Sequence, residues 1–137
     1  GGGFLHVWDI DNPNTNRSVL STTGATEIIS ANAPGFVYDP VSDKFIAWDG
    51  LDSSGAIYTL DMDTLVWARL APNTAVLPGH NPGIEFNGVF GRFQYIPAKN
   101  AFIAVKYTDD NVYVYKLNNQ APMRVPGKPA MPTIVVQ

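Results

Sequence analysis

The sequence predicts an all-β protein built from short antiparallel strands, and three observations support this prediction. The 11 prolines and 12 glycines are spread over all 137 residues. They divide the chain into segments of about 4–8 residues, which suit strands better than helices. These segments are rich in Val, Ile, Tyr, Phe, Trp and Thr, which favour a pleated, half-buried surface. The third observation is an internal repeat with the pattern of strand, turn and strand.

The repeat consists of residues 35–48 (GFVYDPVSDKFIAW) and residues 92–105 (RFQYIPAKNAFIAV), which are identical at six of fourteen positions. The identical pairs are Phe36 and Phe93, Tyr38 and Tyr95, Pro40 and Pro97, Phe45 and Phe102, Ile46 and Ile103, and Ala47 and Ala104. In each copy the proline sets φ to about −65° early in the turn. Asp43 or Asn100 suits the later position, where a left-handed backbone is common. Each copy therefore predicts a β-hairpin.

Further strand-like sequence follows each hairpin. Third strands are predicted at 56–62, 112–117 and, at the start of the chain, 4–10; fourth strands are predicted at 63–70 and 16–22, with a poor candidate at 122–126. The last of these is poor because its prolines cannot donate hydrogen bonds to a neighbouring strand. The unit is then four antiparallel strands that recur every 50–57 residues or so, a period that is typical of propeller blades.

A single blade cannot bury both of its faces, whereas blades stacked around an axis cover one another. We therefore expect one β-propeller segment over residues 1–137. Its parts are a partial blade at 1–31, blades at 35–71 and 88–126, and a linker with a terminal strand at 127–137. These parts amount to about two and a half blades, an incomplete ring, because closed propellers have about four to eight.

Two segments resemble the kelch motif. GGGFLHVWDI at 1–10 is similar to its middle, where a glycine pair ends the second strand and an aromatic third strand follows. IYTLDMDTLVWARL at 57–70 is similar to its second half, with a tyrosine on strand three and Trp67 on strand four. Galactose oxidase-like propellers share this pattern. The resemblance implies the fold and hardly constrains the function. The glycine pair is missing from the later copies, where WDGLDSSG and KYTDDN stand in its place.

An incomplete ring predicts self-association, or a place within a larger propeller, because open blade faces and sheet edges tend to associate. TIVVQ at 133–137 is a β-branched run that has no partner in its own repeat. We expect it to complete a blade, either at the start of this chain or in a neighbouring chain. The alternative is a disordered terminus.

Composition narrows the classes of partner. The formal net charge is −3 and Lys and Arg form no cluster, so a nucleic-acid partner is not expected, because phosphate binding needs a basic face. The absence of cysteine excludes disulfides, thiolate metal sites and cysteine nucleophiles. No apolar run approaches the roughly 18 residues that a membrane helix needs, so no membrane partner is expected.

The candidate site lies in the loops that share one face of the predicted blades. These loops are 21–34, 49–55, 71–88 and 108–111. The candidate ligand-binding residues in them, and at the start of the inner strand that follows, are Asp49, Asp52, His80, Asn81, Glu85, Arg92, Gln94, Asp109 and Asp110. The 71–88 loop is long for a connection, and long loops in compact folds are often functional.

Each group of candidates has a structural alternative. His80 and Glu85 could serve as an acid/base pair or join a metal site, but a metal site usually needs three or more convergent ligands; the alternative is a turn residue. The four loop aspartates suit calcium binding or glycoside hydrolysis, or else solvated turns. Arg92 and Gln94 replace Gly35 and Val37 of the first copy; they either face a central channel or are simply exposed at a strand start.

The recurring aromatic side chains suit either contacts between blades or a platform for sugars. The sequence contains no serine–histidine–acid set, glycine-rich phosphate loop or cofactor fingerprint, and no cofactor is expected. The favoured interpretation is a non-catalytic recognition or scaffold module that binds a protein or a glycan and closes a ring by self-association. The alternative is part of a carbohydrate-active enzyme whose catalytic set is incomplete in this chain.

Overall fold

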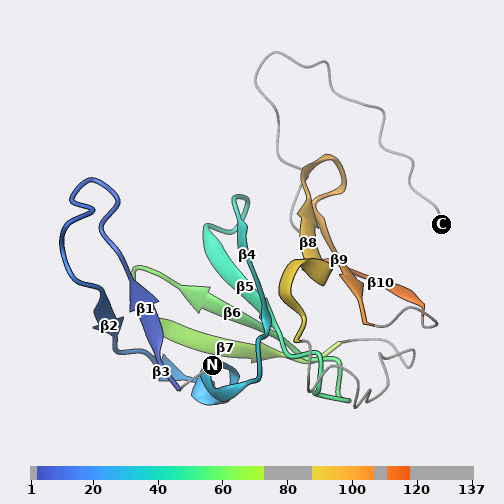
Figure 1. The fold of residues 1–137 in the computed structure, drawn as a ribbon. Coiled ribbons are helices and arrows are strands. Elements are labelled where there is room, and N and C mark those ends of the chain that lie inside the picture. Colours follow the sequence, from blue (N-terminus) through green and yellow to red (C-terminus); the bar gives the residue numbers. More distant parts are fainter. Residues whose placement is uncertain (1–2, 73–87, 107–110, 118–137) are drawn as a thin grey trace.

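Three small β-sheets make up the described part of the chain, which covers residues 3–72, 88–106 and 111–117 of a computed structural model (Figure 1). The N-terminal sheet contains β1 (Leu5–Val7) and β2 (Ser18–Leu20). The central sheet contains β3 (Thr23–Gly24), β4 (Gly35–Asp39), β5 (Lys44–Trp48), β6 (Ile57–Asp61) and β7 (Val66–Leu70). The C-terminal sheet contains β8 (Phe93–Ile96), β9 (Ala101–Val105) and β10 (Val112–Tyr115). Three 3-10 helices, η1 (Thr26–Ser30), η2 (Phe90–Arg92) and η3 (Pro97–Lys99), connect them. The prediction of an all-β fold is confirmed.

The strands β4 to β7 form an antiparallel meander, as the repeat predicts. Its first turn is held by Asp39, whose buried carboxylate accepts hydrogen bonds from the Val41 amide at 3.0 Å and the Ser42 hydroxyl at 2.7 Å. Asp43 has a left-handed backbone with φ of 56°, and its carboxylate accepts a hydrogen bond from the Tyr38 hydroxyl at 2.5 Å. Residues of the hairpin itself therefore hold its turn.

The second copy of the repeat shares the left-handed turn residue and its hydrogen bond from a tyrosine, although Ile96 stands where the first copy has Asp39. Asn100 has φ of 44°, and its side-chain oxygen accepts a hydrogen bond from the Tyr95 hydroxyl at 2.8 Å. The strand register also matches, since Phe36 lies opposite Ala47 and Phe93 lies opposite Ala104. The predicted hairpins and their left-handed residues are confirmed in both copies.

The central and C-terminal sheets pack face to face. Ile46, Trp48 and Ile57 of the central sheet form one buried cluster with Phe93 and Phe102 of the C-terminal sheet. The face of the central sheet that carries Ile46, Trp48 and Ile57 is called its following face. The face of the C-terminal sheet that carries Phe93 and Phe102 is called its preceding face. The two inner strands, β4 and β8, touch at Gly35, where an added Cβ would lie 2.4 Å from the Cβ of Phe93. A glycine is therefore needed for the two strands to approach so closely.

The opposite face of the central sheet, its preceding face, is covered in part by the segment between β2 and β4. Its cluster contains Tyr58, Leu60 and Trp67, with Ile28 from η1 and, at its margin, Leu5 from β1. The segment at 21–34 was expected to be a loop on the ligand face. It instead contributes β3, which pairs in parallel with β7, and η1, which packs on the sheet. The central sheet thus has a fifth strand that the four-stranded prediction lacked.

Specific hydrogen bonds stabilise the pairing of β3 with β7. The Trp67 indole nitrogen donates a hydrogen bond to the Thr22 hydroxyl at 3.1 Å, and the Ala25 amide donates to the Trp67 carbonyl at 3.0 Å. Gly24 has φ of 83°, and a Cβ there would lie 2.2 Å from the same carbonyl oxygen. Only glycine fits at this position, because both the backbone conformation and the space exclude a side chain.

Candidate functional site

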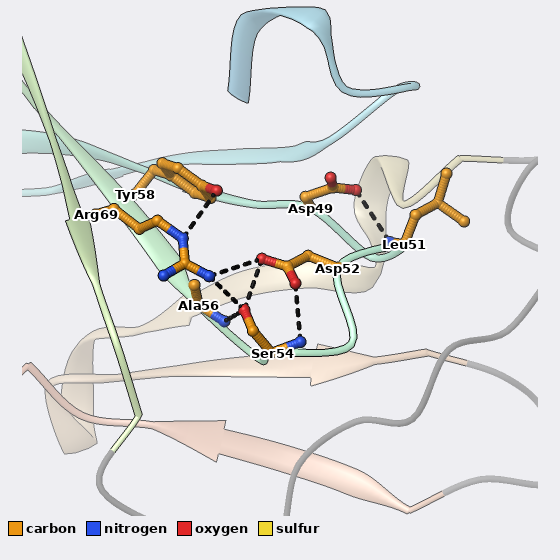
Figure 2. A network of polar contacts seen from close by, with 7 residues as sticks. All are labelled: Asp49, Leu51, Asp52, Ser54, Ala56, Tyr58 and Arg69. Carbon is orange, nitrogen blue, oxygen red and sulfur yellow. Dashed lines mark hydrogen bonds and ion pairs between the residues drawn. The ribbon is translucent and has the colours of Figure 1, made fainter. Parts of the chain in front are cut away.

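A network of polar side chains holds the 49–55 loop, which is one of the loops predicted to carry a site (Figure 2). The carboxylate of Asp52 accepts hydrogen bonds from the Ser54 amide at 2.8 Å and the Ser54 hydroxyl at 2.7 Å. Arg69, on β7, reaches this pair: its Nη2 donates to Ser54 Oγ at 2.6 Å and lies 3.3 Å from Asp52 Oδ2. Asp49 accepts a hydrogen bond from the Leu51 amide at 2.9 Å. Both predicted aspartates therefore bind amides of their own loop.

Arg69 is placed by the register of the central sheet, because it lies opposite Tyr58 on β6. Its Nε donates to the Tyr58 hydroxyl at 3.2 Å, and its guanidinium carbon lies 6.0 Å from the centre of that ring (Figure 2). The sequence prediction missed Arg69 and Ser54. The signal that could have found them is the pairing of the third and fourth strands, which sets Arg69 beside the loop that precedes Tyr58.

The electrostatics of the network favour its charged form. Burial raises the pKa of Asp52, but the hydrogen bonds from Ser54 and Arg69 outweigh it, so this pKa lies below its usual value. Hydrogen bonds to Tyr58 and Asp52 raise the pKa of Arg69. Burial raises the pKa of Tyr58. The arrangement stabilises an ionised Asp52–Arg69 pair at neutral pH, in which Asp52 serves as a hydrogen-bond acceptor within the loop.

The remaining predicted site residues are distributed as follows. Arg92 donates from Nη1 to the Lys106 carbonyl at 3.0 Å, from Nε to the Val89 carbonyl at 3.3 Å, and from Nη2 to the Gly88 carbonyl. Gln94 is exposed on β8, and its Nε2 donates to the Gly91 carbonyl at 2.9 Å. His80, Asn81, Glu85, Asp109 and Asp110 lie outside the described residues. The structure brings Asp49 and Asp52 together in one loop and ties Arg92 to the backbone around η2.

A second candidate surface is the face of the C-terminal sheet that points away from the central sheet. We call it the following face of the C-terminal sheet. On β10, Tyr113 and Tyr115 pack on the core, whereas the alternate residues Val112 and Val114 are 55% and 63% exposed. Val112 pairs with Val105, and Val114 pairs with Ile103. Four aliphatic side chains thus line a sheet face where polar residues would be expected next to water.

The repeat shows what this face is equivalent to. Val105 and Ile103 occupy the positions of Trp48 and Ile46 in the central sheet, given the matching register of the two hairpins. Trp48 and Ile46 are fully buried because the C-terminal sheet covers them. The same positions in the C-terminal sheet have no such cover from the described residues.

An equivalent gap exists on the preceding face of the central sheet. Phe93 is 1% exposed beneath the central sheet, whereas its repeat equivalent Phe36 is 43% exposed. Phe36 stacks on Phe45 with the ring centres 4.8 Å apart. The two rings line an apolar groove of about 260 Å³ between the N-terminal and central sheets. Leu5, Leu20, Leu60 and Met62 also line this groove.

The described residues contain no group of three or more His, Cys, Asp or Glu side chains that could hold a metal ion. Within the same residues, no helix has the length and apolar character required to cross a membrane.

No family model, curated protein or solved structure matches the chain. The functional interpretation therefore rests on the polar network and on the apolar sheet faces described above.

Proposed function

We propose that the chain is a non-catalytic recognition or scaffold module of the β-propeller type, kelch-like or galactose oxidase-like, that binds another β-sheet through its exposed sheet faces. The observation that carries the proposal is the following face of the C-terminal sheet. Val112 and Val114 are exposed there, while Ile57, the central-sheet equivalent of Val112, is buried against a neighbouring sheet. The molecule thus contains both a covered and an uncovered version of the same surface.

The partner that this surface fits best is a second copy of the chain. The packing between the central and C-terminal sheets provides the template, in which a following face receives a preceding face. At the other end, the N-terminal sheet presents exposed Phe4, Trp8 and Val19. One copy's C-terminal sheet would then pack on the next copy's N-terminal sheet. Contacts of this head-to-tail kind close a ring when the rotation between copies allows it.

The non-catalytic part of the proposal is supported by the geometry of the 49–55 loop. Asp49 and Asp52 accept hydrogen bonds from loop amides, and Asp52 is also paired with Arg69. A carboxylate in such an arrangement stabilises a turn. General acid or base work would require it to exchange a proton with a substrate near neutral pH, and its lowered pKa opposes this.

The test is the molar mass in solution, measured by light scattering on a sizing column over a range of protein concentrations. The chain mass is 14.9 kDa, and we expect a discrete multiple of it. Val114→Lys should shift the mass toward that of the monomer, because a charge would be buried in the contact. Leu70→Lys is the matched control, since Leu70 is 41% exposed and lies on β7 of the central sheet, outside both surfaces of the proposed contact.

A monomer at every concentration would refute the self-association. If the two lysine substitutions shift the molar mass equally, the C-terminal sheet is not part of the contact.

A further inference from the structure

The strand β1 has an open edge beside the apolar groove. β6 and β10, the third strands of the other two sheets, pair with β5 and β9 respectively on the inner side. β1 pairs with β2 alone among the described residues. The register of this pair is that of β6 and β7, since Leu5 lies opposite Leu20 as Ile57 lies opposite Leu70. β1 therefore corresponds to a third strand that pairs with no second strand among the described residues, and its backbone can accept one more strand.

The groove shows what the missing strand must carry. In the C-terminal sheet, Phe93 and Phe102 are covered by Ile46 and Trp48 of the preceding second strand, β5. Phe36 and Phe45 are the equivalents of these two rings, and they line the groove. A strand that pairs with β1 must therefore place two apolar side chains, two residues apart, over Phe36 and Phe45.

We propose that residues 133–137 of this chain, TIVVQ, add to the open edge of β1 as its missing second strand. The segment repeats the pattern of the other second strands: TIVVQ aligns with FIAVK at 102–106, and the Ile and the second Val stand at the same places. Ile134 then takes the position of Ile46, and Val136 takes that of Trp48. Both side chains enter the groove, and Val135 faces away from it.

The register follows from the other two sheets. In them the second and third strands are antiparallel, with Ala47 opposite Tyr58 and Ala104 opposite Tyr113. His6 is the equivalent of these two tyrosines on β1. The proposal therefore sets Val135 opposite His6 in an antiparallel pair, with Ile134 opposite Val7.

The chain is long enough for this arrangement. Residues 118–132 lie between the described end of the C-terminal sheet and the proposed strand. Fifteen extended residues reach about 50 Å. Neighbouring stacked sheets are about 10 Å apart, so two sheet spacings require about 20 Å. The proposal uses the blade equivalence of the proposed function and does not depend on self-association.

The first experiment is a disulfide cross-link in the full chain, which contains no native cysteine. His6→Cys combined with Val135→Cys should form an intrachain disulfide in most molecules under dilute oxidising conditions, seen by mass and non-reducing electrophoresis. His6→Cys combined with Ile134→Cys is the matched control and should give several-fold less, because alternate residues of a strand face opposite sides.

The second experiment is hydrogen exchange at residues 5–7. Ile134→Asp should speed exchange of the β1 amides that point away from β2 by tenfold or more, because a charge cannot enter the apolar groove. Val135→Asp should leave this exchange nearly unchanged. The readout is independent of the molar mass, so a failure here is distinguishable from a failure of the proposed self-association.

Three outcomes would overturn the proposal. A disulfide found only between chains would assign the strand to a second copy. Equal cross-linking of the two cysteine pairs would remove the proposed register. Exchange of β1 that does not respond to Ile134→Asp would leave the open edge without this occupant.

Discussion

The repeat supplies a matched pair of phenylalanines that tests the packing of the sheets. Phe93 is 1% exposed, and its ring centre lies 5.6 Å from that of Phe102 and 5.9 Å from that of Trp48. Phe93→Ala removes a fully buried ring from a close-packed contact and should cost about 3–5 kcal/mol of unfolding free energy. Phe36→Ala removes a ring that is 43% exposed. In a chain that lacks residues 133–137, which are proposed above to cover Phe36, about half of the burial is lost there, so we expect a cost of about 1–2 kcal/mol.

The assay is equilibrium unfolding in urea, followed by tryptophan fluorescence, at a protein concentration where light scattering gives a single species. The two substitutions delete the same atoms from equivalent positions, so differences in chemistry cancel. Equal losses of free energy in a chain that lacks residues 133–137 would refute the conclusion that the C-terminal sheet buries Phe93 while the described sheets leave Phe36 open. If Phe36→Ala becomes more costly as concentration rises, the groove is also part of a contact between copies.

Three further predictions concern single contacts. Gly35→Ala should destabilise the fold by about 1–3 kcal/mol, because its Cβ would overlap the ring opposite it, whereas Gly91→Ala has space and should change the urea midpoint little. Arg69→Gln should raise the pKa of Asp52 toward its usual value, because a hydrogen bond to the carboxylate is lost; an unchanged carboxyl titration by NMR would contradict this. Asp61 accepts hydrogen bonds from Lys44 Nζ at 2.8 Å and from the Thr64 amide at 3.0 Å, which lower its pKa to about 2. The stability advantage of the wild type over Asp61→Asn should therefore be present above about pH 4 and lost as the pH falls toward 2. A difference in urea midpoints that does not vary with pH would contradict the last prediction.

Local signals made most of the fold predictable from the sequence. The hairpins depend on neighbours in the chain, such as Asp39 capping its own turn and Asp43 adopting a left-handed backbone. Because both copies of the internal repeat predict a hairpin, the prediction for one copy supports the prediction for the other. The all-β class follows from the same short-range features.

The missed features are those that depend on distant partners. β3 has only two residues, and its parallel pairing with β7 depends on Trp67, more than forty positions along the chain. No local sequence signal around Gly24 predicts its pairing with Trp67. Arg92 stands where the first copy has glycine, and its hydrogen bonds to three backbone carbonyls depend on how the chain returns past η2.

For the candidate site, the sequence predicted the 49–55 loop, and the structure shows that Arg69 is its partner. Asp49 and Asp52 are recognisable as loop acids, and their turn chemistry is local. Arg69 reaches Asp52 only because β6 and β7 are in register. The exposed faces of the sheets could not be predicted from the sequence either. Val112 and Val114 have the apolar character of core residues, and only the structure shows that no described sheet covers them.

The two-residue strand β3 has a consequence for how the molecule comes apart. The hairpins of the central and C-terminal sheets close over short stretches of chain, whereas Thr23 meets Val66 only after a long loop is closed. Contacts of that kind form late and open early. The N-terminal segment up to η1 should therefore detach as a unit while β4 to β7 stay paired, and a protease should cut residues 8–17 before it cuts β4 to β7. Loss of the β3–β7 pairing would expose the outer edge of β7. By covering this edge, β3 protects the sheet from strand-to-strand aggregation.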